Sequence, residues 1–330
     1  MGSDESSTIN NKYNVLEAKG KGASAVVYLV ESMDNNKNKK YAAKVLKEVT
    51  PSFEREITIL EKLSKLKCPY LVNLIEFGEG PVKIGSKSIK TKQYIILDYA
   101  SKGKIFDYIS CTQKGLSEIH AKFMFKNILE GVQSCHLSGI CHRDLKLHNI
   151  LLDNDFNPKI CDFGFATEIK GKDGSGKLTD YLGTLNYAAP EIFLHKPYDG
   201  VKADIFSLGV VLINLVTSKI GFIKANKNDK LYKYIILKNY EAYWNKVKRQ
   251  LGEISEELKH LYFKMISFNP DERPSIEEVF NHPWMKEVMN MNETELKELQ
   301  KDVFNDFEKR EKTIISSHEV LESSSSSDIF

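Results

Sequence analysis

The feature that most constrains this chain is the polar stretch HRDLKLHN at residues 142–149. A short apolar segment, residues 150–152, and a turn follow it, and then comes the motif DFG at residues 162–164. An isolated Asp or Asn usually caps a helix or occupies a turn. Two polar motifs in this order, separated by one apolar strand, favour a functional site that contains Asp144, Asn149 and Asp162.

The two motifs resemble the catalytic loop H-R-D-x-x-x-x-N and the D-F-G sequence of the eukaryotic protein kinase family. The resemblance implies that Asp144 orients an acceptor hydroxyl and takes its proton, while Lys146 adds a positive charge near the transferred phosphoryl group. Asn149 and Asp162 would bind Mg²⁺, which prefers oxygen ligands. Thr184, in a segment that ends with APE at residues 189–191, matches the serine/threonine arrangement together with Lys146.

The first hundred residues resemble the nucleotide-binding half of the same family. A lone glycine motif is usually a tight turn and a lone strand lysine is usually solvated, but here both precede the catalytic motifs in the family order. Residues 20–28 are similar to the glycine-rich hairpin, with Ala25 at the third glycine position. Lys44, on a predicted strand at 41–45, would contact phosphates, and Glu56 would be its ion-pair partner.

Glu56 falls in a predicted helix, residues 52–66, whose apolar face contains Ile57, Leu60, Leu63 and Leu66. The resemblance also predicts the residues that contact ATP. They are Gly20, Lys21, Gly22, Ala23, Ser24, Ala25, Val27, Ala42, Lys44, Leu97, Asp98, Ala100, Asn149, Leu151 and Asp162.

The expected fold is α+β, the bilobal protein kinase fold, because the resemblance covers nearly the whole chain. It predicts a β-rich N-lobe at residues 13–99 and a helical C-lobe at 100–286, with the ATP cleft between them. Within the C-lobe, apolar spacing predicts a helix over 119–137 with Leu137 buried. Residues 1–12 are predicted to be a disordered leader, and we favour this over N-myristoylation, whose pattern the first six residues formally fit.

Composition excludes several other classes of protein. The formal net charge of +2 over 330 residues gives no support for nucleic-acid binding. Five scattered cysteines without a C-x-x-C pair indicate reduced thiols in a cytosolic or nuclear protein. The apolar helix expected from Asp204 to about Val216 is shorter than the roughly 18 residues that a membrane span needs, so we expect a core helix and no stable membrane insertion.

The tail, residues 287–330, is predicted to contain an amphipathic helix at about 292–312. Asn292 and Glu295 fit a capping box, and Leu296, Leu299, Val303 and Phe307 form an apolar stripe. Because the chain looks closest to the calcium/calmodulin-dependent kinase group, this helix could be autoinhibitory or bind a regulator. Its many acidic residues make a calmodulin target less favoured than packing on the C-lobe. The Ser-rich end is predicted to be disordered.

The function predicted by the resemblance is a serine/threonine protein kinase that uses ATP and Mg²⁺ to phosphorylate protein substrates. The alternative is a pseudokinase scaffold, although Lys44, Asp144, Asn149 and Asp162 are all present. A small-molecule kinase is less favoured, since residues 183–191 suit a peptide-docking ledge.

Four further expectations follow from the family likeness. Lys104 and His148 stand where relatives selective for basic substrates carry acids, which argues against a basic consensus. Arg143 implies control by an activation-segment phosphate; Asp180 would replace this phosphate in part, unless Asp180 is only solvated or Thr179 is the phosphosite. Glu191 is expected to pair with Arg273, and Asp204 to accept hydrogen bonds from the catalytic-loop backbone.

Overall fold

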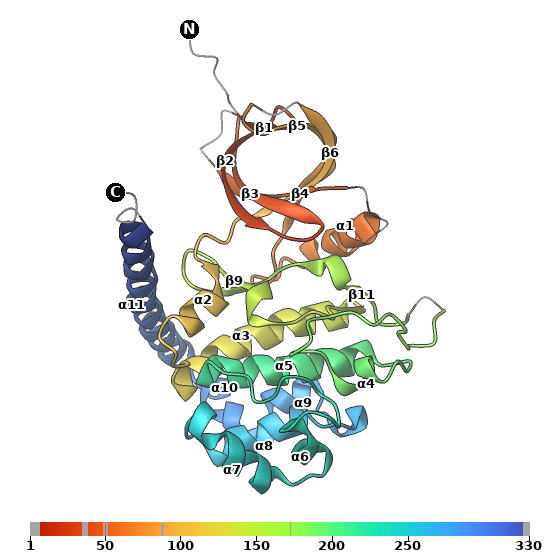
Figure 1. Ribbon diagram of the computed structural model, residues 1–330, viewed down its shortest axis with the longest axis vertical. Helices are drawn as coiled ribbons and strands as arrows, with labels where there is room; N and C mark the ends of the chain where they lie inside the picture. The colour runs from red at the N-terminus through yellow and green to blue at the C-terminus, as the bar shows by residue number, and fades with distance from the viewer. Residues whose placement is uncertain are drawn as a thin grey trace. The chain divides into compact units, whose positions relative to one another are not determined.

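The computed structural model describes residues 7–34, 39–48, 50, 52–86, 89–171 and 173–325, with side chains as far as residue 317. The chain divides into two compact units, Met1–Ser101 and Lys102–Phe330. Strands dominate unit 1 and helices dominate unit 2 (Figure 1). This agrees with the predicted α+β class, and the division falls two residues after the boundary predicted between residues 99 and 100.

Unit 1 is a closed barrel with the strand order β1-β2-β3-β4-β6-β5, and one helix accompanies it (Figure 1). Its elements are β1 (Thr8–Ile9), β2 (Tyr13–Lys21), β3 (Ala25–Ser32), β4 (Lys40–Leu46), α1 (Ser52–Ser64), β5 (Leu74–Lys83) and β6 (Lys90–Asp98).

The short strand β1 corrects the expectation that residues 1–12 are disordered, as far as residues 7–12 are concerned. Thr8 pairs with Asn14 of β2 on one side and with Lys83 of β5 on the other, which closes the barrel. Ile9 is fully buried in the barrel core. The Asn10 side chain then donates to the Tyr94 hydroxyl at 2.7 Å. Burial of Ile9 and pairing on both sides explain why this segment is ordered, while residues 1–6 lie outside the described residues.

The same junction leaves little room beside Gly80. A Cβ atom on Gly80 would lie 2.4 Å from the Asn10 side-chain oxygen, so a larger residue would force the Asn10 side chain to move away from the Tyr94 hydroxyl. This contact could not be predicted from the sequence, because the two residues lie far apart along the chain.

Unit 2 contains mostly helices with three short β pairings. Its strands are β7 (Gly103–Lys104), β8 (Ile140–Cys141), β9 (Ile150–Leu152), β10 (Pro158–Ile160) and β11 (Thr167–Glu168). Its α-helices are α2 (Ile105–Ser110), α3 (Glu118–Leu137), α4 (Pro190–Phe193), α5 (Gly200–Thr217), α6 (Tyr232–Ile236), α7 (Tyr240–Leu251), α8 (Glu256–Met265), α9 (Ile276–Phe280), α10 (Lys286–Met289) and α11 (Glu293–Ser325). Four 3₁₀ helices are η1 (Leu147–Asn149), η2 (Phe163–Phe165), η3 (Pro270–Glu272) and η4 (Pro283–Met285).

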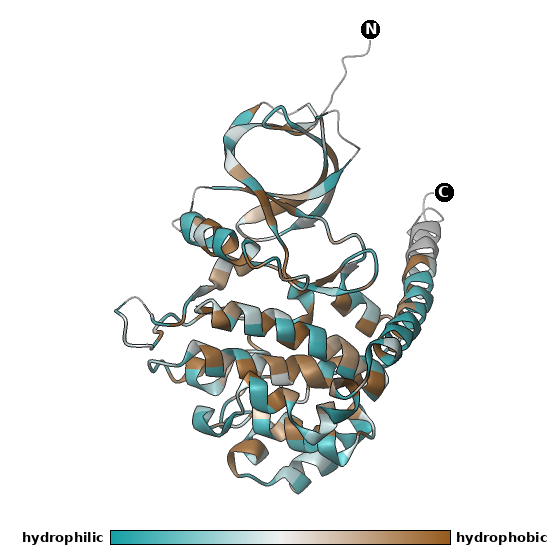
Figure 2. Cartoon of the chain, turned by 180° about the vertical axis from the view of Figure 1, so that it is seen from behind, coloured by the Kyte–Doolittle hydropathy of each residue, from teal (hydrophilic) through white to brown (hydrophobic). Residues whose placement is uncertain are grey.

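The core of unit 2 is built around α5, which is strongly hydrophobic along its length (Figure 2). With 18 residues it is longer than the sequence predicted, and by length and composition it is the one helix in the described chain that could cross a membrane. However, 83% of it is buried inside the structure, as expected for the core helix of a globular unit.

Two residues predicted to be buried are exposed instead. Leu66 is 45% exposed because α1 ends at Ser64, so Leu66 lies beyond the helix. Leu137 is 83% exposed because it is the last residue of α3, where the chain turns. Ile57, Leu60 and Leu63 are buried as predicted. Helical spacing therefore identified correctly which face of each helix is buried. It gave the wrong burial only for residues at or beyond the ends of the helices.

The C-terminal helix α11 is longer than the 292–312 predicted, and it packs on α2 and α3 of unit 2 (Figure 1). The predicted capping box is confirmed: Glu295 N donates to Asn292 Oδ1 at 3.0 Å, and Asn292 N donates to Glu295 Oε2 at 2.8 Å. Phe304 and Phe307 contact the Phe156 ring, with centroid distances of 5.1 and 5.5 Å.

A buried arginine fixes the position of α11. The Arg310 guanidinium donates to the backbone oxygens of Tyr108, Lys114 and Gly115, at 2.9–3.2 Å. These carbonyls belong to α2 and the turn that follows it. Because a buried charge needs such partners, Arg310 indicates that α11 is an integral part of unit 2, which is the alternative that the sequence favoured.

Truncation after Asn290 is therefore expected to destabilise the protein. If the loss of the Phe304, Phe307 and Arg310 contacts lowers the free energy of unfolding by about 3 kcal/mol, Tm should fall by roughly 5–10 °C. Differential scanning calorimetry of the full chain and the truncated chain measures this. Lys309→Ala, an exposed neighbour on α11, is the matched control. An unchanged Tm after truncation would show that α11 contributes nothing to the stability of unit 2.

Candidate active site

Four polar residues of unit 2 form a closed hydrogen-bonded group around Asp144. Lys146 Nζ donates to Asp144 Oδ2 at 2.7 Å and to Thr184 Oγ1 at 2.7 Å. Thr184 Oγ1 in turn donates to Asp144 Oδ1 at 2.8 Å. The Asn149 amide nitrogen donates to Asp144 Oδ2 at 3.0 Å and to the Asp144 backbone oxygen at 2.9 Å. The structure thus brings together Asp144, Lys146 and Thr184, as the resemblance implied, and it adds Asn149, which the resemblance assigned to the magnesium ion.

The arrangement holds one carboxylate in a fixed orientation. Asp144 is 5% exposed, so its charge depends on the Lys146 ammonium for compensation. Its two oxygens already accept three side-chain hydrogen bonds, which leaves about one lone pair, on Oδ1, for a hydroxyl brought by a second molecule. A carboxylate in this position can align such a hydroxyl and accept its proton, and Lys146 can stabilise negative charge that develops nearby.

The backbone of the catalytic loop is held by the buried carboxylate of Asp204 in α5, as the sequence predicted. His142 N and Arg143 N donate to its two oxygens, each at 2.8 Å, and His136 Nε2 lies 2.9 Å from Oδ2. Burial by itself raises the pKa of Asp204, but the hydrogen bonds from His136 and His142 outweigh it and hold the pKa below its ordinary value. Asp204 therefore remains a charged acceptor that fixes the loop.

Arg143 in the catalytic loop and Asp162 in the DFG motif have left-handed backbone conformations. Arg143 has φ 66° and Asp162 has φ 62°, which side chains other than glycine seldom adopt. Gly183, with φ 124°, faces the same loop, and a Cβ there would lie 3.1 Å from the Arg143 backbone oxygen. Strain of this kind persists where the surroundings hold it in place, and it is concentrated at functional sites.

Asn149 and Asp162 lie beside each other at the open end of the β9–β10 hairpin. Ile150 pairs with Ile160, and Cys161 N donates to the Asn149 backbone oxygen at 3.0 Å, so the pairing ends one residue before Asp162. The Asn149 amide nitrogen is directed at Asp144, which turns the amide oxygen away from that carboxylate.

These two oxygen donors fit a magnesium ion. Among the described residues no group of three or more His, Cys, Asp or Glu side chains is arranged around a metal position. Mg²⁺ does not require such a group, because it keeps several waters and completes its shell with substrate phosphate oxygens. A carboxylate from Asp162 and an amide oxygen from Asn149 are the set of protein ligands that such an ion uses.

In unit 1, Lys44 and Glu56 form the ion pair that the sequence predicted. Lys44 Nζ lies 2.5 Å from Glu56 Oε1, and the two side chains are only 15% and 7% exposed. Lys44 is on β4 opposite Val27 of β3, and Glu56 is on the inner face of α1. The pair joins the helix to the barrel.

The glycine-rich hairpin connects β2 and β3. Gly22 N donates to the Ala25 backbone oxygen at 2.9 Å, and Lys47, which the sequence did not single out, donates to the carbonyls of Gly22 and Ala23. A Cβ at Gly20 would meet no atom within 4 Å. Packing within the chain therefore does not require glycine at position 20. A phosphate that approaches the backbone closely would require it, because a side chain would be in the way.

The remaining residues predicted to contact a nucleotide are divided between the units. Ala42 of β4 pairs with Leu97 of β6, and Ala100 is buried just after β6. The Asp98 carboxylate accepts from the backbone and side chain of Asn73, so it also has a structural role. Leu151 lies in β9 of unit 2.

The activation segment contains one connection that the sequence missed. Arg143 Nη1 lies 3.5 Å from Asp180 Oδ2, the contact expected from the sequence. Tyr198 joins them: its hydroxyl accepts from Arg143 Nη1 at 3.4 Å and donates to the Asp180 backbone oxygen at 2.8 Å. Burial raises the pKa of Tyr198, so it remains a protonated donor. Apart from its apolar ring, nothing in the sequence indicates that Tyr198 connects Arg143 to Asp180.

The expected pair of Glu191 and Arg273 is also present, and it is structural. The guanidinium nitrogens donate to the two carboxylate oxygens at 2.6 and 2.7 Å, and the Arg273 side chain is fully buried. The bidentate geometry ties α4 to the segment before α9.

Comparison with known proteins identifies the family of the chain. The protein kinase domain family matches residues 13–285. CBL-interacting serine/threonine-protein kinase 13 of Arabidopsis thaliana is 32% identical over 289 residues, which cover 86% of this chain and 53% of that protein. Sperm motility kinase 3A of Mus musculus is 33% identical over 279 residues, covering 84% and 51%. The chain thus spans about half the length of these curated relatives. A match over most of the chain, together with the preserved group around Asp144, shows that this chain belongs to the protein kinase domain family.

Proposed function

We propose that the protein is an active serine/threonine protein kinase, which transfers the γ-phosphate of ATP to protein hydroxyls in the presence of Mg²⁺. The observation that carries this proposal is the hydrogen-bonded group of Asp144, Lys146 and Thr184, since it holds a carboxylate and an ammonium where an acceptor hydroxyl would be aligned. Two relatives carry serine/threonine-protein kinase in their names, which supports the choice of acceptor.

Each residue has a defined part in this reaction. Asp144 orients the acceptor hydroxyl and takes its proton as the new oxygen–phosphorus bond forms and the bond from the γ-phosphorus to the ADP oxygen breaks, so that ADP leaves. Lys146 stabilises charge on the phosphoryl oxygens, and Lys44, held by Glu56, binds the nucleotide phosphates. When bound, Mg²⁺ neutralises phosphate charge; Asn149 and Asp162 would hold it. Backbone groups near Asp98 and Ala100 would bind the adenine edge, as the family resemblance implies.

The test is incubation of the purified protein with radiolabelled ATP, Mg²⁺ and a mixture of proteins, followed by phosphoamino-acid analysis. Phosphoserine and phosphothreonine are expected. The pseudokinase alternative predicts binding of a fluorescent ATP analogue without transfer, and label in phosphotyrosine would overturn the assignment of the acceptor.

We further propose that Asp180 takes over part of the role of an activation-segment phosphate. Arg143 is 6% exposed, and its Nη2 atom has no hydrogen-bond partner among the described residues, so the guanidinium requires a nearby anion. Asp180 is the carboxylate within reach. Because its Oδ2 atom lies 3.5 Å from Arg143 Nη1 and its side chain is 36% exposed, it compensates less of the guanidinium charge than a phosphate would.

In phosphatase-treated enzyme, Asp180→Ala is therefore expected to lower kcat/KM by roughly three- to tenfold, the size of a partly exposed charge pair. Asp180→Asn, which keeps the shape and removes the charge, should behave in the same way. Thr179→Ala should change little. Peptide kinase assays measure all three. If Thr179→Ala or phosphatase treatment silences the enzyme while Asp180→Ala stays active, Thr179 is the switch.

A further inference from the structure

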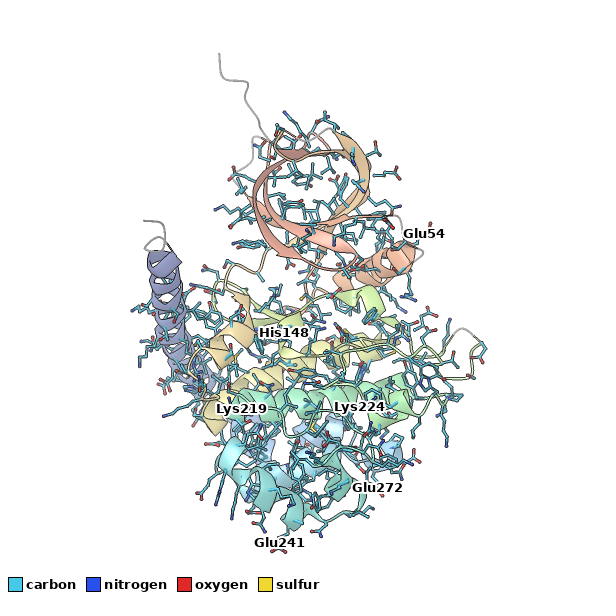
Figure 3. All side chains as sticks on the ribbon, viewed as in Figure 1. Glu54, His148, Lys219, Lys224, Glu241 and Glu272 are labelled. Atoms are coloured by element: carbon cyan, nitrogen blue, oxygen red, sulfur yellow. The ribbon has the colours of Figure 1, made fainter. Side chains whose placement is uncertain are left out.

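A lysine of unit 1 lies beside the tip of the glycine-rich hairpin, residues 22–24. Lys47 directly follows β4, the strand that carries Lys44, and β4 pairs with β3 so that Leu46 lies opposite Ala25. Figure 3 shows β3 and β4 side by side in the wall of the barrel. Lys47 therefore comes from the strand next to the hairpin, where its side chain reaches the tip.

The three backbone carbonyls of the tip all accept hydrogen bonds from Lys47. Its ammonium donates to the Gly22 oxygen at 2.5 Å and to the Ala23 oxygen at 3.0 Å, and its backbone N–H donates to the Ser24 oxygen at 2.9 Å. Lys92 Nζ of β6 in turn donates to the Lys47 backbone oxygen. The tip residues are exposed, so these hydrogen bonds, rather than packing, fix their conformation.

The direction of these carbonyls determines where the neighbouring N–H groups point. All described peptide bonds are trans, and in a trans peptide the C=O and the N–H that follows it point in opposite directions. Because the Gly22 and Ala23 carbonyls are turned towards Lys47, the N–H groups of Ala23 and Ser24 are turned away from it. In the described part of the chain, neither of these N–H groups has a hydrogen-bond partner. Two adjacent N–H groups of this kind can bind phosphate oxygens together.

We propose that Lys47 is a positioning residue for the phosphates of ATP: it holds the tip of the hairpin so that the N–H groups of Ala23 and Ser24 face the nucleotide. This inference rests on the proposed kinase function. The family resemblance implies that Ala23 and Ser24 contact ATP, and it assigns no part to Lys47. The two side-chain hydrogen bonds of Lys47 order the tip before ATP binds, so the cost of ordering it does not reduce the affinity for ATP.

The test compares the binding of ATP with that of adenosine, which lacks phosphates, by isothermal titration calorimetry. Lys47→Met keeps most of the length of the side chain and removes its donors. It is expected to lower the affinity for ATP in the presence of Mg²⁺ by roughly three- to tenfold, the size of one or two lost hydrogen bonds. The affinity for adenosine should remain as in the wild type. Equal losses for ATP and adenosine, or no loss for ATP, would overturn the proposal.

Two further variants and a change of salt separate positioning from charge. Lys47→Arg retains donors that can reach two carbonyls, so it should bind ATP more tightly than Lys47→Met. Lys40→Met makes the same change at the opposite, exposed end of β4 and should affect neither ligand. The difference between wild type and Lys47→Met should persist in about 0.5 M NaCl, because salt screens the attraction between exposed charges. Loss of the difference in high salt, or an arginine variant as weak as the methionine variant, would overturn the positioning role.

A measurement without nucleotide tests the hairpin itself. NMR relaxation of the Ala23 and Ser24 amides is expected to give lower order parameters in Lys47→Met than in the wild type, because two hydrogen bonds to the tip are lost. Lys40→Met should leave the order parameters unchanged. If the wild-type protein binds no ATP, the proposed function fails, and the order parameters still decide whether Lys47 orders the tip. Equal order parameters in the wild type and Lys47→Met would overturn the inference.

Discussion

Asp144→Asn is expected to lower kcat by about 10³-fold, the range for loss of a positioned general base. The asparagine has nearly the same shape as the aspartate. Its amide oxygen can still accept from Lys146 and Asn149, and its amide nitrogen can donate to the Thr184 hydroxyl, which rotates to accept. The hydrogen-bonded group thus survives, but the group that accepts the proton is gone.

Single-turnover phosphotransfer measures this effect, and calorimetric titration with ATP and Mg²⁺ is expected to show nearly unchanged nucleotide affinity. Asp155→Asn is the matched control, because it makes the same chemical change at an exposed turn after β9. Transfer by Asp144→Asn within a few-fold of the wild-type rate would remove Asp144 from the role of base.

Lys44→Met is expected to lower kcat by roughly 10²–10³-fold, as loss of one electrostatic stabiliser does. Methionine keeps most of the length of the side chain and removes the ammonium. It also leaves Glu56, 6% exposed, without the partner that lies 2.5 Å away in the native protein. A partly buried charge that loses its partner destabilises the fold, so Tm should also fall, by a few degrees.

Glu56→Gln separates these two effects, because it keeps the Lys44 ammonium and removes only the charge that holds it. We expect a smaller loss of kcat/KM, about tenfold, with nucleotide affinity lowered. Glu61→Gln, on the exposed side of α1, is the control. Wild-type kinetics for Glu56→Gln would mean that the ion pair has no part in placing Lys44.

Several parts of the site could be predicted from the sequence because their chemistry is local. Asp144, Lys146 and Asn149 lie within six residues, and one loop conformation brings their side chains together. Lys44 and Glu56 are farther apart, and the resemblance to the family implied their pairing. The ion pair of Lys44 and Glu56 is confirmed by the structure.

Other features depended on contacts between distant residues. The barrel is closed by β1, whose partner on β5 lies more than seventy residues later, and two residues of strand are too short for any periodic signal. Tyr198 links Arg143 to Asp180, yet its hydroxyl partners become apparent only when the activation segment is folded. The family resemblance implied the Arg143–Asp180 contact, but it did not indicate the tyrosine that joins the two residues.

The amino-acid sequence by itself determined the family, the catalytic group and the faces that α1, α3 and α11 bury, since motif spacing and helical periodicity are properties of neighbouring residues. Only the tertiary structure decided where α11 packs. Arg310 is held mainly by backbone carbonyls of α2 and the turn that follows it. A backbone carbonyl oxygen is the same acceptor in every residue, whatever side chain that residue carries. An interaction with backbone atoms leaves no pattern in the residues that provide them, so its partner is set by the folded chain alone.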